Sequence, residues 1–157
     1  MKTTHPSIAA LVPHQDPMCL LDTLLEAGEE SLLAEVTPRC QSLFAVPEGI
    51  PAWVGIEWLA QAIAAWSGRR ALAKGGTPRI GFLLGSRHYH CEVAHFPFDR
   101  PVRVEVTLDY LAGNGLGAFR GRLLDTEEYT LAEAALSVYE PDSPEAMAAM
   151  LQQDSSS

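Results

Sequence analysis

Two polar side chains interrupt an otherwise apolar segment, and they are the residues most suited to chemistry. Between residues 50 and 66 only Glu57 and Gln61 break a run of apolar, aromatic and small side chains. Because a spacing of four residues places side chains on one helical face, the Gln61 amide can hold the Glu57 carboxyl group in place. Burial disfavours the charged form of a carboxyl group, so Glu57 has the character of a proton donor. The alternative is a pair that only satisfies its own hydrogen bonds.

These two residues need a helix that the rest of the chain encloses. A segment that is apolar on every face predicts a buried helix, which we expect over residues 53–74, introduced by Pro51. The charge of Glu57 and the pair Arg69 and Arg70 argue against a membrane span. The segment is therefore expected to be the core helix of a globular domain, with no membrane as a partner.

Strand patterns flank this helix on both sides. Two runs with a hairpin turn precede it, and a long alternating run and a three-stranded meander follow it. An antiparallel sheet wrapped around one long central helix is the hotdog fold, an α+β architecture. The strands are expected at residues 18–26, 31–37, 79–93, 102–111, 115–124 and 129–139.

Length, charge and cysteine usage exclude several classes of protein. The chain has 157 residues, so we expect one domain over residues 1–141 and a partly disordered tail over 142–157. A net charge of −9 argues against nucleic acid as a partner. No secretory signal is recognised in the first residues, which favours a cytoplasmic location. Cys19, Cys40 and Cys91 lack metal-ligand spacing and are expected to be reduced and mostly buried.

Three blocks of sequence carry a family likeness. They read Leu-Val-Pro-His14-Gln-Asp-Pro-Met-Cys-Leu-Leu-Asp22, Ile50-Pro-Ala-Trp-Val-Gly-Ile-Glu57-Trp-Leu-Ala-Gln61 and Phe82-Leu-Leu-Gly-Ser-Arg87. Together they resemble the β-hydroxyacyl-acyl-carrier-protein dehydratases of fatty-acid synthesis. The likeness is greatest to the dehydratase-like proteins encoded with aryl-polyene biosynthesis. It implies a hotdog dimer, of like or unlike subunits, that acts on thioesters of acyl carrier protein and needs no cofactor or metal.

The resemblance implies a role for each candidate residue. Loss of water from a β-hydroxyacyl thioester needs a base for the α-proton, an acid for the hydroxyl group and donors for the developing enolate oxygen. Glu57 would be the acid and His14 the base. The backbone N–H groups of Ala52 and Trp53 would hold the thioester, and Gln61 would line the site.

The chain departs from the family at the position of the usual base. Fourteen residues before the acid, where the dehydratases have a catalytic histidine, this chain has Leu43. His14 matches a second histidine of the family, which lies beside the acyl tunnel. It either replaces the missing base or is a structural remnant. Two other functions therefore stay open: a catalytically silent partner of an active hotdog subunit, and an acyl thioesterase in which Glu57 activates water.

Other polar residues are assigned by position. Arg69 and Arg70 follow the apolar segment, where they would dock an acidic carrier protein or only complement the helix dipole. His88 and His90 alternate along a strand and are expected on its solvated face rather than as a metal pair. Because one sheet leaves part of a long helix uncovered, a partner subunit is expected to cover Trp58 or its neighbours.

Overall fold

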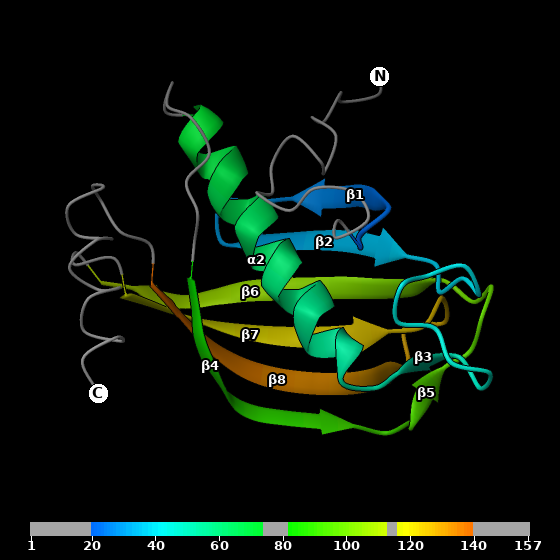
Figure 1. Ribbon diagram of the computed structural model, residues 1–157. Coiled ribbons are helices and arrows are strands. Elements are labelled where there is room, and N and C mark those ends of the chain that lie inside the picture. Colours follow the sequence, from blue (N-terminus) through cyan, green and yellow to red (C-terminus); the bar gives the residue numbers. More distant parts are fainter. Residues whose placement is uncertain (1–19, 74–81, 113–115, 140–157) are drawn as a thin grey trace, which may run out of the picture.

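One long helix lies across one face of a curved antiparallel sheet (Figure 1). The computed structural model describes residues 20–73, 82–112 and 116–139. The helix, α2, covers Val54–Ala73. This is the predicted hotdog arrangement. The strands of the main sheet are β1 (Thr23–Ala27), β2 (Ser31–Val36), β4 (Phe82–Cys91), β6 (Val102–Leu111), β7 (Leu116–Leu124) and β8 (Thr130–Tyr139).

The order of the strands differs from their order in the sequence. In space they run β1-β2-β6-β7-β8-β4, and all neighbouring pairs are antiparallel. Strand β4, which follows the helix, therefore crosses to the far edge of the sheet and pairs with β8. A second pair, β3 (Ile50–Pro51) and β5 (His95–Phe96), joins the segment before α2 to the segment after β4. The sequence did not predict this small sheet, because two-residue strands carry no periodic pattern.

Most element boundaries agree with the sequence prediction within a few residues. The expected helix over 53–74 becomes Val54–Ala73, and the strand expected at 102–111 is β6. The first strand is shorter than expected, since β1 begins only at Thr23. The expected tail over 142–157 lies outside the described residues. Among the described residues, no helix has the length and hydropathy that would let it cross a bilayer.

The core lies between α2 and the sheet. The helix packs mainly against β2 and β6, with further contacts to β7 and β4. Its two buried tryptophans face aromatic partners: Trp58 lies 4.7 Å from Phe96, and Trp66 meets Phe119 edge-on at 5.3 Å between ring centroids. Between them Leu59 is fully buried against Gly121 of β7. A strand residue without a side chain at 121 lets the helix approach the sheet closely.

One expectation about the cysteines is wrong. Cys40 is exposed, because it lies in the surface loop between β2 and β3, and Cys91 is half-buried on β4. Cys19 lies outside the described residues.

The contact between Leu59 and Gly121 gives a test of this packing. A Cβ atom at position 121 would lie 2.7 Å from the Leu59 Cδ2 atom, and the buried leucine has little room to move. We expect Gly121→Ala to lower the free energy of unfolding by about 1–3 kcal/mol, the usual cost of overpacking. Urea-induced unfolding measures this change.

Gly85→Ala is the matched control, because a Cβ atom at 85 meets nothing within 4 Å. Its effect should stay within about 0.5 kcal/mol. Equal stability of the two variants would contradict the close packing at Gly121.

Candidate active site

Glu57 and Gln61 form the expected pair on one face of α2. The Gln61 Nε2 atom donates to Glu57 Oε1 over 3.4 Å, at the long end for a hydrogen bond, and Gln61 Oε1 accepts from the Leu20 backbone N–H at 2.8 Å. Gln61 is fully buried. It therefore ties the helix to the segment before β1 as well as to the carboxyl group.

The expected burial of Glu57 is only partly met. In the single chain the side chain is half-buried, whereas the prediction took the helix to be enclosed on every face. Trp53, Ile56, Glu57 and Ala60 follow one another at helical spacing, and each is half-buried or exposed. We call these four residues the open stripe. It exists because the six-stranded sheet covers only one side of the first half of α2.

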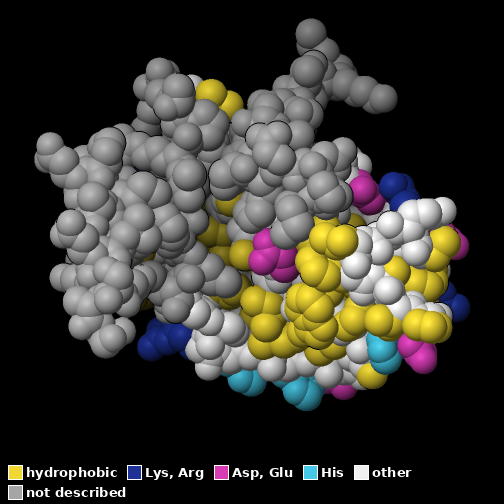
Figure 2. Space-filling view, viewed as in Figure 1, with side chains coloured by type: hydrophobic (Ala, Val, Ile, Leu, Met, Phe, Trp, Pro, Cys, Tyr) yellow, Lys and Arg dark blue, Asp and Glu magenta, His cyan; other side chains and the backbone are white. Residues whose placement is uncertain are grey.

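The open stripe belongs to a larger apolar surface. Figure 2 shows hydrophobic side chains gathered over the N-terminal part of α2 and the loops beside it. Trp53 and Leu43 are 57% and 60% exposed. Trp58, in contrast, is 2% exposed in the single chain, because it points to the sheet and packs on Phe96. Since the sheet already buries Trp58, the cover expected from a partner over Trp58 or its neighbours would fall on the neighbours in the open stripe, and it stays a prediction.

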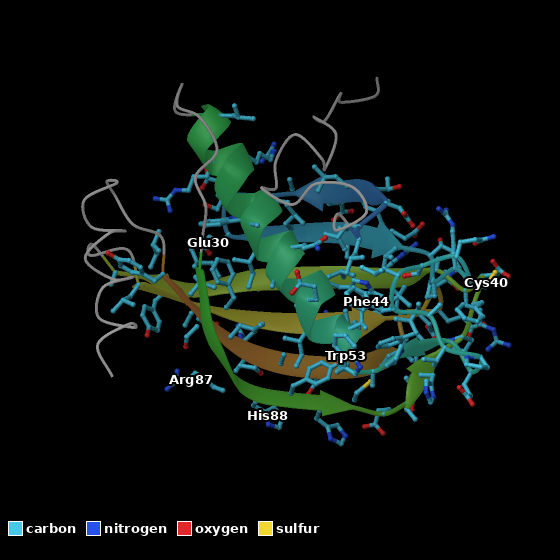
Figure 3. The ribbon with its side chains drawn as sticks, viewed as in Figure 1. Glu30, Cys40, Phe44, Trp53, Arg87 and His88 are labelled. Atoms are coloured by element: carbon cyan, nitrogen blue, oxygen red, sulfur yellow. The ribbon has the colours of Figure 1, made fainter. Side chains whose placement is uncertain are left out.

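The loop that carries Leu43 lies at the start of the helix. Phe44 meets Trp53 edge-on, with ring centroids 5.2 Å apart, and the two side chains lie together at the N-terminal end of α2 (Figure 3). Leu43, which precedes Phe44, therefore lies in the loop beside the helix start. His14 lies outside the described residues, so its distance from Glu57 stays a prediction.

The backbone at the helix start corrects the expected pair of thioester donors. The Ala52 N–H donates to the Ala94 carbonyl oxygen at 3.0 Å, so it is not available to a substrate. The Trp53 N–H donates to no acceptor within the part of the chain that the structure describes. Of the two predicted N–H groups, only that of Trp53 is suited to hold a thioester oxygen.

The carbonyl oxygen of Ala52 accepts a hydrogen bond from a tyrosine on the edge strand β4. The Tyr89 hydroxyl group of β4 donates to the Ala52 oxygen at 2.6 Å. Burial, followed by the nearby Cys91 side chain, raises the pKa of Tyr89 far above its ordinary value of 10.0, so the hydroxyl group keeps its proton. No pattern in the sequence indicated the contact between Tyr89 and Ala52.

The outer face of β4 carries the two histidines, as predicted. His88 and His90 are exposed, and His90 Nε2 lies 3.0 Å from Glu92 Oε1. In Figure 3 the labelled side chains of Arg87 and His88 point away from α2. Arg87 is exposed as well, because the irregular register between Ser86 and His88 turns it outward.

The other end of α2 carries the arginines expected to dock a carrier protein. Arg69 and Arg70 are half-buried and line a groove of about 590 Å³ together with Trp66. The Arg70 guanidinium group lies over the Trp66 ring, 5.4 Å from its centroid. Because Glu29, Glu30 and Asp109 line the same groove, its charge is mixed rather than positive.

The sequence matches one family model. The model is described as ApeP-like, ApeP dehydratase, and it covers residues 6–152. A search of curated proteins finds no significant match.

Solved structures show the same fold. The dehydratase heterocomplex ApeI:P from Xenorhabdus doucetiae is 26% identical, with a TM-score of 0.85 over 94% of this chain and 99% of the other. The TT0310 protein from Thermus thermophilus is 13% identical, with a TM-score of 0.61 over 80% of this chain and 98% of the other. The PaaI protein of the E. coli phenylacetic acid degradation operon is 8% identical, with a TM-score of 0.58 over 74% of this chain and 77% of the other. The last two likenesses concern the fold alone.

The role of Gln61 as a structural tie is testable. Gln61→Leu replaces the amide with an apolar side chain of similar size, which leaves the Leu20 N–H without its acceptor. We expect the free energy of unfolding to fall by about 1–3 kcal/mol, the cost of an unsatisfied backbone donor. Gln41→Leu, in an exposed loop, is the control and should change stability by less than about 0.5 kcal/mol in urea unfolding. If Gln61→Leu were as stable as the wild type, the role of Gln61 as a structural tie would be contradicted.

Proposed function

The chain belongs to the ApeP-like dehydratase family, and from this membership we propose that it dehydrates β-hydroxyacyl thioesters of acyl carrier protein to enoyl thioesters. The pathway would be aryl-polyene or fatty-acid-like chain biosynthesis. The observation that carries the proposal is the position of Glu57: a carboxyl group one helical turn from the Trp53 N–H, on a stripe open to a substrate or partner. No cofactor is needed for this chemistry.

Each step of the reaction falls to a group of this chain. His14 would take the α-proton, and the electrons of that C–H bond form the new double bond. The Cβ–O bond breaks, and Glu57 gives its proton to the departing hydroxyl group, which leaves as water. The negative charge that develops on the thioester oxygen would be met by the Trp53 N–H. Gln61 would keep the Glu57 carboxyl group turned to the substrate, since it contacts Glu57 Oε1.

We further propose a second hotdog subunit over the open stripe. Apolar side chains as exposed as Trp53 and Leu43 are typical of surfaces that a partner covers. A partner there would exclude water from around Glu57, which favours proton transfer to the substrate rather than to solvent. The relative from Xenorhabdus doucetiae is a complex of two dehydratase subunits, which supports a partner of the same fold, identical or different.

Carrier docking at Arg69 and Arg70 is also proposed. The Arg70 guanidinium group lies over the Trp66 ring, 5.4 Å from its centroid, at the edge of the groove where a carrier would dock. The two arginines lie about 18–20 Å along the helix axis from Glu57, at 1.5 Å per residue. The acidic side chains in the same groove weaken the attraction for an acidic carrier, so docking there would rest on directed ion pairs rather than on net charge.

Glu57→Gln tests the acid role. The amide keeps the shape of the side chain but cannot give a proton, so kcat for the dehydration of a β-hydroxyacyl thioester should fall by about two to four orders of magnitude. Formation of the enoyl product is followed by its absorbance and by mass spectrometry. Thermal unfolding should be nearly unchanged, since the side chain is half-buried. Turnover close to that of the wild type would take Glu57 out of the mechanism.

His14→Ala separates the enzyme from the silent partner. If His14 is the base, the variant loses about two to four orders of magnitude in kcat. His90→Ala is the control, because His90 is exposed on the outer face of β4. Full activity of His14→Ala would show that His14 is not the base. If, in addition, turnover required a second hotdog subunit and survived Glu57→Gln, the silent-partner function would replace the enzyme.

Thioester hydrolysis is the remaining alternative, and product analysis distinguishes it. A thioesterase releases a free acid and a thiol, whereas a dehydratase keeps the thioester and forms a double bond. We expect the product to be an intact thioester that has lost one molecule of water.

A further inference from the structure

Tyr89 meets the helix start at the peptide group that precedes the proposed thioester donor. The carbonyl oxygen of Ala52 and the N–H of Trp53 belong to one peptide group. That oxygen accepts the Tyr89 hydroxyl group at 2.6 Å and also the Gly55 N–H at 3.0 Å. Two donors thus occupy both lone pairs of a single carbonyl oxygen. The two hydrogen bonds fix the peptide group at its carbonyl oxygen.

The planarity of the peptide bond carries this constraint to Trp53. In a trans peptide group the C=O and N–H bonds lie in one plane and point in opposite directions. Since Tyr89 and Gly55 hold the Ala52 oxygen, the Trp53 N–H must point away from both of them. It leaves the helix at its open N-terminal end, where Trp53 is 57% exposed. The orientation of the Trp53 N–H is therefore set by the hydrogen bonds to the Ala52 oxygen of the same peptide group.

The same hydrogen bond strengthens the donor. A hydrogen bond to a peptide oxygen draws electron density toward that oxygen, which makes the N–H of the group a better donor. The hydroxyl of Tyr89 is suited to this because burial and Cys91 raise its pKa and keep it protonated. The Ala52 N–H is meanwhile held by the Ala94 oxygen at 3.0 Å. Strand β4 and the segment between β4 and β5 thus clamp the turn from the sheet side.

Gly55 makes the approach of the tyrosine possible. A Cβ atom at position 55 would collide with the Tyr89 hydroxyl oxygen and lie 2.7 Å from Leu123 Cδ1. Gly55 is in the first turn of α2, where a glycine lowers helix stability relative to alanine. A glycine is needed at position 55 mainly because of Tyr89, whose hydroxyl oxygen is the atom nearest to the position of a Cβ atom.

We propose that Tyr89 is a positioning residue of the dehydration reaction: its hydroxyl group orients and polarises the Ala52–Trp53 peptide group, so that the Trp53 N–H donates to the thioester carbonyl oxygen. This inference rests on the proposed function, since it names the group that acts behind the thioester donor. Tyr89, on the edge strand β4, would thus act on the thioester carbonyl group through a single peptide group.

Kinetics of Tyr89→Phe give the first test. Phenylalanine keeps the ring in place and removes only the hydroxyl group. Because the donor is weakened rather than removed, kcat should fall about tenfold, less than the roughly 10²–10³ seen on deleting an oxyanion donor. KM should change by less than about twofold, since the interaction grows in the transition state. Tyr129→Phe, at a tyrosine that is 67% exposed, is the matched control and should leave both constants unchanged.

Infrared spectroscopy measures the donor directly and does not depend on turnover. The probe is a saturated acyl-pantetheine thioester, labelled with ¹³C at its carbonyl group, which cannot be dehydrated. Bound to the wild-type protein, its C=O band should shift to lower wavenumber than in water, and Tyr89→Phe should reverse a large part of that shift. Tyr129→Phe should keep the full shift.

The outcomes separate the inference from the proposed function. A wild-type band without a shift, or an equal shift in Tyr89→Phe, overturns the role of Tyr89 even if dehydration is observed. A shift that depends on Tyr89 in a protein that dehydrates no β-hydroxyacyl thioester supports the positioning role and overturns the dehydratase.

Discussion

The depth at which α2 lies on the sheet decides where the candidate residues of the helix are found. Leu59 is fully buried over Gly121, and this glycine lets the helix backbone come close to β7. On either side of this contact Trp58 and Trp66 pack on Phe96 and Phe119, which fixes the helix at two further points. Because a packed helix moves as one body, the side chains of its first turns are fixed with it.

A few directed hydrogen bonds then set the rotation of the helix about its axis. Gln61 holds the segment before β1, the Trp66 Nε1 atom donates to the Glu29 oxygen at 3.0 Å, and Ala52 is clamped by Tyr89 and Ala94. The side chains of Gln61, Trp66 and Tyr89 are buried or half-buried, so leaving their polar groups unbonded would be costly. Together they turn Glu57 toward the uncovered side instead of the sheet.

The open stripe is the place where the proposed second subunit would act. Glu57 lies there beside exposed apolar side chains, and covering them would give the water-free surroundings that the proposed elimination of water requires. Leu43 also stands at the position where related dehydratases have their base. Both features are accounted for if a second subunit, or the segment that carries His14, completes the site. The likeness to a complex of two dehydratase subunits agrees with this view.

The sequence by itself determined the elements and the choice of Glu57. Hydrophobic periodicity placed α2 and the meander strands β6, β7 and β8 within one or two residues, because these are long elements with an unbroken pattern. The pairing of Glu57 with Gln61 followed from helical spacing alone. The histidines on the outer face of β4 followed from the alternation of a strand.

Only the tertiary structure decided which groups at the helix start are free to act. The engagement of Ala52 by Ala94, the approach of Tyr89 and the burial of Trp58 all involve residues more than thirty positions apart. Such contacts leave no periodic trace in the sequence, since they depend on how β4 crosses to the edge of the sheet beside the helix start. The partial exposure of Glu57 was missed for the same reason: a sequence shows that a helix is apolar, but only the structure shows which side of the helix the sheet covers.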